Sequence, residues 1–392
     1  MSLASQLAPH YSRFRVSERL LLTGHSHQAW PDVALEGQLE AYADAAELVD
    51  EKWGRAFAKA EAVRDGFRRL LADPGGAIAL GASTHELLVR FLSALDLSTR
   101  RRLVTTDGEF HSARRQLARL GEAGLEVVVV PAAPVDTLAE RLAAAADART
   151  AAVLTSSVLF ETSRMVPGLG DLAAICLERG VELLVDAYHH LGVRALSLTT
   201  AGLEHAWVVG GGYKYLQLGE GSCFLRLPPQ AAAMRPVVTG WYAEFGALAH
   251  EASAPVVAYG PGAARFAGST YDPTSHYRAA RVLAFFAEQG LTADVLEASY
   301  GRQRALLESA FDDLDAPPGV ITRDRTADPS AFGGFLSLET PHAERLQELL
   351  AARGVLTDSR GRHLRFGPAP YLADGQLAEA IERLGEVLPL VG

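Results

Sequence analysis

The segment Val181-Glu182-Leu183-Leu184-Val185-Asp186, with Ala187-Tyr188-His189-His190 directly after it, carries the main evidence for the fold. It is an apolar run that ends in a carboxylate, and a run without polar alternation is typical of a strand buried on both faces. A second apolar run at 206–209 is followed by three glycines and by Tyr213-Lys214-Tyr215. We expect both runs to belong to one parallel or mostly parallel sheet, whose ligands lie beyond the carboxyl ends of the strands.

The same alternation of short β-branched runs with helical segments extends to both sides. Further strands are expected at 103–106, 126–130, 151–156 and 222–227, and helices at 84–95, 112–123, 135–146 and 170–179. Residues 213–218 lie between glycine-rich ends and predict a turn into an antiparallel strand. From about Ser275 the pattern predicts a long helical stretch, strands at 332–338 and 363–366, and helices at 343–353 and 374–388, which indicates a smaller α+β domain.

Length and composition limit the class of protein. The chain has 392 residues, 48% of them hydrophobic, which predicts two or three domains with a sizeable core. A net charge of -10 without any basic run excludes a nucleic-acid binder. Two cysteines, Cys176 and Cys223, exclude a disulfide framework and a cysteine-rich metal site. Because no apolar stretch reaches the length of a signal peptide or membrane span, we expect a cytoplasmic protein without membrane contacts.

The densest group of reactive side chains runs from Asp186 to Lys214. A carboxylate at a buried strand end needs a cationic or hydrogen-bonding partner. A lysine after three glycines and between aromatic residues has a desolvated setting, which lowers its pKa toward that of an imine-forming amine. The alternative is that Asp186 caps a turn and Lys214 is an ordinary surface lysine.

Two other segments favour the functional interpretation. Gly81-Ala82-Ser83-Thr84 precedes a predicted helix, and hydroxyl residues at a helix N-terminus suit a phosphate. Phe110 follows a predicted strand, where its ring could stack on a flat ligand. Taken alone, each has a simpler explanation, an N-cap for Ser83 and a core position for Phe110.

A strand-end acid, an imine-competent lysine, a phosphate site and a stacking aromatic are the groups that pyridoxal 5′-phosphate (PLP) requires. Their order along the chain resembles the class V aminotransferase branch of fold type I PLP enzymes, and within it kynureninase. The resemblance covers about residues 75–372. It implies a mostly parallel seven-stranded sheet in a three-layer large domain, with a smaller α+β C-terminal domain. We place an N-terminal arm at 1–52, the large domain at 53–274 and the small domain at 275–392.

The resemblance also implies roles for individual residues. Lys214 is the Schiff-base lysine, Asp186 pairs with the pyridine nitrogen, and His189, in the Asp-x-x-His motif, lies near the cofactor or substrate. Tyr213 is a phosphate ligand or proton donor. The other expected cofactor-binding residues are Ser83, Thr84, Phe110, Trp241, Ser269 and Thr270. Arg365, in Leu364-Arg365-Phe366-Gly367, is expected to bind the substrate carboxylate.

The chain departs from the kynureninase pattern where the substrate should bind. The expected aspartate after Phe110-x-x is Ala113, and the usual Gly-Asn-Ser-Leu-Gly is Gly24-His25-Ser26-His27-Gln28. We therefore count His25 and His27 as candidate substrate-binding residues. A metal site built from these histidines lacks a carboxylate or cysteine at suitable spacing, and the glycine fingerprint of a Rossmann nucleotide site is missing.

Three functions fit these observations. The first is kynureninase-like hydrolysis of a Cβ–Cγ bond in kynurenine or a related amino acid. The second is an aminotransferase or a β-eliminating carbon–sulfur lyase. No cysteine follows Cys223, which argues against desulfurase chemistry with a nucleophilic cysteine on a late loop. The third is a non-catalytic binding protein of the same fold. We also expect a homodimer, with the Ser269-Thr270 loop completing the partner's site.

Overall fold

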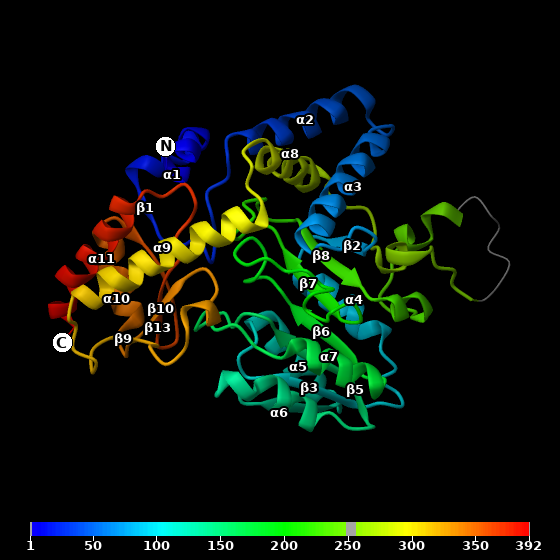
Figure 1. Cartoon of the computed structure of the whole chain (residues 1–392). Helices are drawn as coiled ribbons and strands as arrows, with labels where there is room; N and C mark the ends of the chain where they lie inside the picture. Colours follow the sequence, from blue (N-terminus) through cyan, green and yellow to red (C-terminus); the bar gives the residue numbers. More distant parts are fainter. Residues whose placement is uncertain (1, 248–255, 392) are drawn as a thin grey trace.

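A seven-stranded sheet forms the centre of the computed structural model, which describes residues 2–247 and 256–391 (Figure 1). Its strands are β2 (Ala77–Gly81), β3 (Arg102–Thr106), β4 (Glu126–Val130), β5 (Thr150–Ser156), β6 (Glu182–Asp186), β7 (Trp207–Gly211) and β8 (Cys223–Leu227). Their order is β2-β8-β7-β6-β5-β3-β4. Only β8 runs antiparallel to its neighbours, β2 and β7. The expected mostly parallel seven-stranded sheet is confirmed.

Helices cover both faces of this sheet, which explains the unbroken apolar runs. They are α3 (Trp53–Leu70), α4 (Thr84–Ala94), α5 (His111–Glu122), α6 (Leu138–Ala145) and α7 (Leu169–Glu178). Two more helices lie outside this layer: α8 (Thr274–Glu288) packs on α3, and α2 (Val33–Leu48) packs on α8. Alternate residues of β6 enter different cores: Leu183 and Val185 pack into one, and Leu184 packs into the other with Trp207. Every residue of β5 is buried. The sheet is therefore the middle layer of three.

The C-terminal part forms a second sheet of order β12-β13-β10-β9. The helices and strands of this C-terminal part are α9 (Ala293–Asp313), β9 (Thr322–Arg323), β10 (Leu336–Glu339), α10 (Ala343–Ala352), β11 (Val355–Leu356), β12 (Asp358–Arg360), β13 (His363–Phe366) and α11 (Asp374–Val387). The N-terminal segment joins this part: α1 (Leu3–Leu7) lies beside it in Figure 1, and β1 (Leu20–Leu21) pairs in parallel with β11. The domain limits at 53 and 275 stay predictions.

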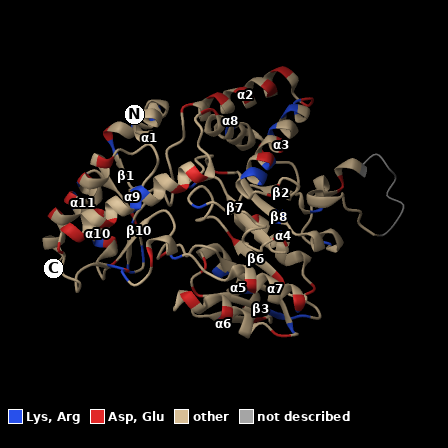
Figure 2. Ribbon diagram, in the orientation of Figure 1, with Lys and Arg blue, Asp and Glu red and all other residues tan. Residues whose placement is uncertain are grey.

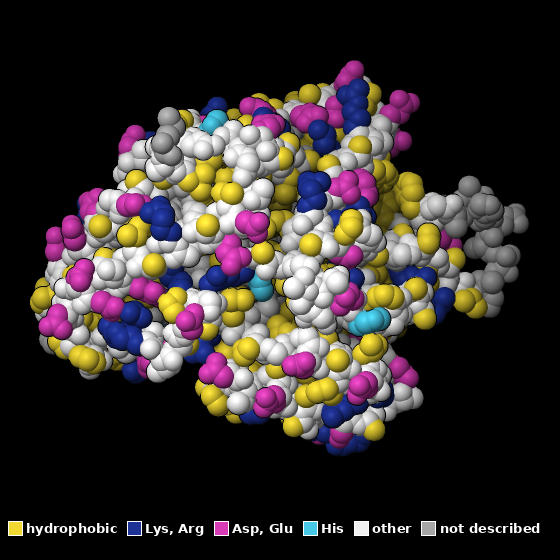
Figure 3. Space-filling view, in the orientation of Figure 1, with side chains coloured by type: hydrophobic (Ala, Val, Ile, Leu, Met, Phe, Trp, Pro, Cys, Tyr) yellow, Lys and Arg dark blue, Asp and Glu magenta, His cyan; other side chains and the backbone are white. Residues whose placement is uncertain are grey.

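Short 3-10 helices complete the chain. They are η1 (Ala8–Phe14), η2 (Val16–Glu18), η3 (Val135–Thr137), η4 (Pro229–Ala233), η5 (Trp241–Ala247), η6 (Gly262–Phe266), η7 (Pro329–Ala331) and η8 (Leu388–Leu390). The described ranges contain no helix long and apolar enough to span a bilayer. Acidic and basic residues are distributed over both lobes (Figure 2) and are interspersed on the face shown in Figure 3.

A buried chain of hydrogen bonds joins the N-terminal segment to the turn after β7. Gln217, in that turn, accepts a bond from the Tyr11 hydroxyl and donates to Gln28 Oε1 at 2.9 Å. Gln28 Nε2 in turn donates to the Tyr300 hydroxyl of α9 at 2.6 Å. All four side chains are buried, so this chain fixes the turn against both the N-terminal segment and α9.

Replacing Gln217 tests this connection. Gln217→Ala leaves the Tyr11 hydroxyl and the Gln28 carbonyl without their partner, and we expect a loss of about 3 kcal/mol in the free energy of unfolding. Urea denaturation followed by tryptophan fluorescence measures it. Gln6→Ala, at an exposed position, is the control. Equal unfolding midpoints for the two variants would contradict the assigned role.

Candidate active site

Lys214 lies at the carboxyl end of β7 and is only 6% exposed. Its Nζ is 2.6 Å from Nε2 of His189 and lies over the rings of Tyr188 and Phe110, at 4.8 Å and 5.4 Å from their centroids. Burial lowers the pKa of Lys214 to about 7, while the charge of Asp186 opposes that shift. A large fraction of this amine is therefore neutral at neutral pH, the form that attacks a carbonyl.

The turn that carries Lys214 is fixed by backbone bonds at both ends. Gly212 N donates to Ser222 O at 2.9 Å, and Leu218 N donates to Gly212 O at the same distance. A Cβ at Gly212 would lie 2.4 Å from Leu218 Cδ1. Glycine is required there by this close approach, and the glycine-rich sequence before Lys214 is explained in this way.

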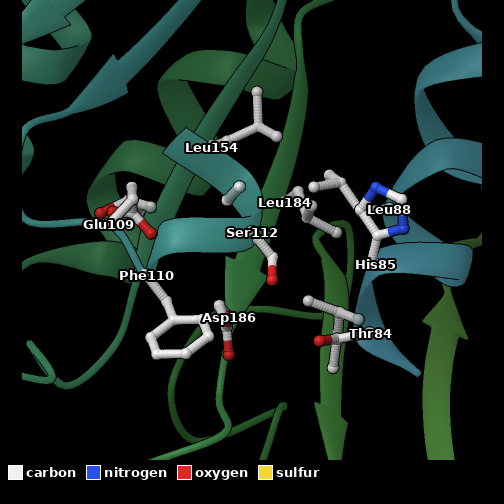
Figure 4. Close-up of a pocket in the computed structure, with 12 residues that line it drawn as sticks. Thr84, His85, Leu88, Glu109, Phe110, Ser112, Leu154, Leu184 and Asp186 are labelled. Atoms are coloured by element: carbon white, nitrogen blue, oxygen red, sulfur yellow. The ribbon is translucent and has the colours of Figure 1, made fainter. Parts of the chain in front are cut away.

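Asp186 ends β6, the strand next to β7. Its Oδ1 accepts a bond from the Tyr188 backbone N–H at 2.8 Å. Burial raises the pKa of Asp186, and the Lys214 charge opposes this. In Figure 4 its carboxylate lies between the Phe110 ring and Thr84, in a pocket that all three residues line. The acid, the aromatic ring and the helix N-terminus predicted from the sequence thus come together.

The N-terminus of α4 is formed by a reciprocal cap. The Ser83 hydroxyl accepts from Glu86 N at 3.2 Å, and Glu86 Oε2 accepts from Ala82 N at 2.9 Å. The arrangement differs from a standard capping box, because Glu86 accepts from the residue before the N-cap and not from the N-cap itself. The cap engages the Ser83 side chain, whereas Thr84 faces the pocket in Figure 4. The positive end of α4 is thereby directed at the space beside Asp186.

Glu109 is a buried acid to which sequence reasoning gave no role. It lines the same pocket and accepts bonds from Ser156 Oγ at 2.6 Å, Ser156 N at 2.9 Å and Thr106 Oγ1 at 3.1 Å. Burial raises the pKa of Glu109 to about 7, and the nearby charge of Asp186 adds to the shift. The sequence feature that could have identified Glu109 as a site residue is its position directly before Phe110 and after an apolar strand.

Arg365 and His25 meet on the small-domain side of Lys214. Arg365 is buried on β13, donates to Phe160 O and pairs with Asp358. His25 is buried, stacks on Phe335 at 4.7 Å, and has its pKa lowered to about 3 by burial and by Arg365. Neither Asp358 nor Phe335 was predicted from the sequence, although the spacing of Asp358 and Arg365 across a turn fits opposite positions in a hairpin.

Four other residues predicted from the sequence do not line the pocket beside Asp186: His27, Trp241, Ser269 and Thr270. The His27 ring stacks on Tyr213 at 4.9 Å, and its Nε2 is 3.8 Å from Glu220 Oε1. Trp241 Nε1 donates to Thr270 Oγ1 at 3.2 Å. Ser269 and Thr270 line a second, larger cavity, which also reaches Ala82 beside the α4 cap. Within one chain these two residues do not line the pocket beside Asp186.

The residues at the carboxyl edge of the sheet fit PLP. A buried amine with a lowered pKa lies beside a neutral histidine, because burial and Lys214 lower the pKa of His189. The pocket beside it is bounded by a ring face, a carboxylate and a helix N-terminus. Among the described residues, no group of three or more histidine, cysteine or acidic side chains is arranged to hold a metal ion.

Comparison with known proteins identifies two groups of similar chains. No family model matches the sequence. A curated kynureninase of Burkholderia pseudomallei is 26% identical over 404 residues, covering 97% of this chain and 92% of its own. The alignment therefore extends over nearly the whole of both proteins.

Solved structures with the same fold have lower identity. C-DES, solved with glycine covalently linked to its PLP cofactor, gives a TM-score of 0.84 at 17% identity and covers 96% of this chain and 98% of its own. Another structure of C-DES describes it as a cystine C-S lyase. The cysteine desulfurase CsdA of Escherichia coli gives 0.81 at 16% identity, covering 99% of each chain. These findings confirm the resemblance to the class V branch of fold type I PLP enzymes.

The buried acid Glu109 predicts a specific pH dependence of stability. Its raised pKa means that the folded protein holds a proton there between about pH 4.5 and 7 that the unfolded chain releases. Stability gained from this proton is present at low pH and lost as pH rises toward 7. In Glu109→Gln this contribution disappears, so wild type should lose on the order of 2 kcal/mol relative to the variant between pH 5 and pH 8.

Chemical denaturation at several pH values measures this difference. The hydrogen bonds that glutamine changes add a constant offset, so only the slope is diagnostic. Glu122→Gln, an exposed position on α5, should run parallel to wild type. Parallel curves for wild type and Glu109→Gln would show that Glu109 titrates normally.

Proposed function

We propose that this chain is a PLP-dependent enzyme that acts on an amino acid through Lys214, with kynureninase-like hydrolysis of a Cβ–Cγ bond as its first candidate reaction. The observation that carries this is the buried Lys214 amine beside Asp186, Phe110 and the α4 N-terminus. The kynureninase of Burkholderia pseudomallei, similar over nearly the whole chain, supports the first candidate.

When bound, PLP supplies an aldehyde for an amine and a ring that withdraws electrons from the substrate. Asp186 would hold a proton at the ring nitrogen, Phe110 would lie against the ring, and Ser83 and Thr84 would meet the phosphate at the positive end of α4. Lys214 would hold the aldehyde carbon. Trp241 would also meet the phosphate, and Ser269 and Thr270 would meet the phosphate held by the partner chain.

The remaining residues bind substrate and move protons. Arg365 would bind the substrate carboxylate, and His25 and His27 would bound the side-chain pocket. Neutral His189 lies with Nε2 2.6 Å from Lys214 Nζ, and this contact would orient the amine that takes up a proton. Burial raises the pKa of Tyr213 to about 12, so its hydroxyl keeps its proton and can donate it.

The second candidate is β-elimination at a carbon–sulfur bond. It is favoured by the fold similarity to C-DES, a cystine C-S lyase, over 96% of this chain. An aminotransferase reaction uses the same groups. Position in the cytoplasm stays a prediction.

Labelling of lysine tests the cofactor assignment directly. The chain has three lysines, Lys52, Lys59 and Lys214. After incubation with PLP and reduction with borohydride, peptide mass spectrometry should find the added group on Lys214. Lys214→Ala should lose both the label and the visible absorbance of the bound cofactor, and Lys59→Ala should keep both. Label on Lys52 or Lys59 alone would refute the assignment.

Product analysis separates the candidate reactions. With kynurenine or 3-hydroxykynurenine, hydrolysis releases anthranilate or its hydroxy derivative together with alanine. With cystine, elimination releases pyruvate. We expect anthranilate from wild type and at least a thousandfold less from Lys214→Ala, since the reacting amine is lost. Pyruvate from cystine without anthranilate from kynurenine would establish the second candidate.

We also propose a homodimer in which each chain completes the other's site. Support comes from the exposed aromatic side chain of Trp241, 44% exposed, and from the open cavity that Ser269 and Thr270 line. Sedimentation should give twice the chain mass. Lys214→Ala mixed with Ser269→Ala/Thr270→Ala should regain activity, because a hybrid dimer contains one intact site. A fully active monomer would contradict the proposal.

A further inference from the structure

Arg365, the proposed substrate-carboxylate ligand, is already paired with a carboxylate of its own chain. Asp358 lies opposite Arg365 in the β12–β13 hairpin. Its Oδ2 accepts from Arg365 Nη2 and its Oδ1 accepts from Arg360 Nη1 at 2.7 Å. The side chains of Arg365 and Asp358 are 3% and 10% exposed. Each carboxylate oxygen thus contacts a different arginine, and water screens the pair weakly.

Several buried polar atoms around this pair have no hydrogen-bond partner. They are Arg365 Nε, both ring nitrogens of His25, the Tyr215 hydroxyl and His189 Nδ1. His25, His189 and Arg365 all lie within 6 Å of the Phe335 ring, at 4.7 Å, 5.8 Å and 5.7 Å. Buried polar groups in proteins are normally paired. A ligand that brings acceptor oxygens to this cluster would satisfy its donors, among them Arg365 Nε and the Tyr215 hydroxyl.

The charges of the cluster leave room for one anion. Arg365 and Arg360 carry two positive charges, and Asp358 cancels one of them. His25 adds none at neutral pH, because burial and Arg365 lower its pKa to about 3. Among Arg365, Arg360 and Asp358, one net positive charge remains, which suits a substrate with a single carboxylate at this end.

We propose that Asp358 is a specificity-determining residue, an internal carboxylate that shares Arg365 with the carboxylate of the bound amino acid. The proposal rests on the proposed function, in which Arg365 binds that carboxylate. Asp358 holds the guanidinium in place when no substrate is present. It also weakens the attraction of Arg365 for anions, so that a carboxylate binds well only when the rest of the ligand makes contacts too.

The test compares the affinity of two small amines for wild type and Asp358→Asn, both loaded with PLP. Glycine carries a carboxylate and ethylamine does not, and visible absorbance of the cofactor reports binding of either. Removing one negative charge beside Arg365 should lower the Kd of glycine about tenfold, and leave that of ethylamine within about twofold. Asp73→Asn, which breaks the pair of Asp73 with Arg226 elsewhere, should change neither value.

A glycine Kd that is unchanged or raised in Asp358→Asn overturns the proposal, and so does an equal change for ethylamine. If wild type takes up no PLP, the proposed function fails instead, and the carboxylate site is then tested by the rise in melting temperature with propionate. That rise should be larger in Asp358→Asn than in wild type.

Asp358→Asn leaves Arg365 buried without its partner and can fail to fold. In that case Asp358→Ser opens space for a small anion. A melting temperature restored by acetate, and not by chloride at equal ionic strength, supports an Arg365 that accepts an external carboxylate. No restoration refutes it.

Discussion

The burial of one amine, that of Lys214, is the constraint on which the site depends. A lysine is rarely buried because its ammonium loses hydration, and the group responds with a lowered pKa. The structure provides the neutral amine with a hydrogen-bond partner, His189, and with aromatic surfaces on Tyr188 and Phe110. The glycines before it let the chain turn tightly, and Gln217 fixes that turn against the N-terminal segment. Elements distant in sequence thus hold one side chain in a dry setting.

Strands and helices could be predicted from the sequence wherever burial requires a clear run or stripe of apolar residues. β5 and β6 lie inside a three-layer structure, so their residues are apolar without interruption and were recognised. β2 was not, because Ala77–Gly81 is a short edge strand in which alanine and glycine fill three of the five positions. α3 was not either: two of its buried positions are Ala56 and Ala60, which give a weak apolar stripe. The strand expected at 332–338 starts only at Leu336, since Gly333 and Gly334 precede it.

The residues of the site also fall into a group that could be predicted from the sequence and a group that could not. Residues at strand ends and at a helix N-terminus are placed by local sequence, so the grouping of Asp186, Phe110 and Thr84 could be predicted. Partners that meet only through the tertiary fold could not. His25 and Asp358 are separated by more than three hundred residues and come within 3.7 Å. Glu109 is prominent only because Ser156, on another strand, completes its hydrogen bonds.

The cost of burying the two basic side chains of the site, Lys214 and Arg365, is compensated in different ways, so the two ends of the site differ in charge. Lys214 meets its burial largely by a lowered pKa, so its end of the pocket offers a neutral amine. Arg365 cannot release its proton under ordinary conditions and is compensated by Asp358 instead, so its end stays cationic. Under the proposed function, an amino acid would meet a carbonyl-reactive group at Lys214 and a cation at Arg365. Its carboxylate would then be drawn toward Arg365, on the side of β13, before its side chain makes any contact.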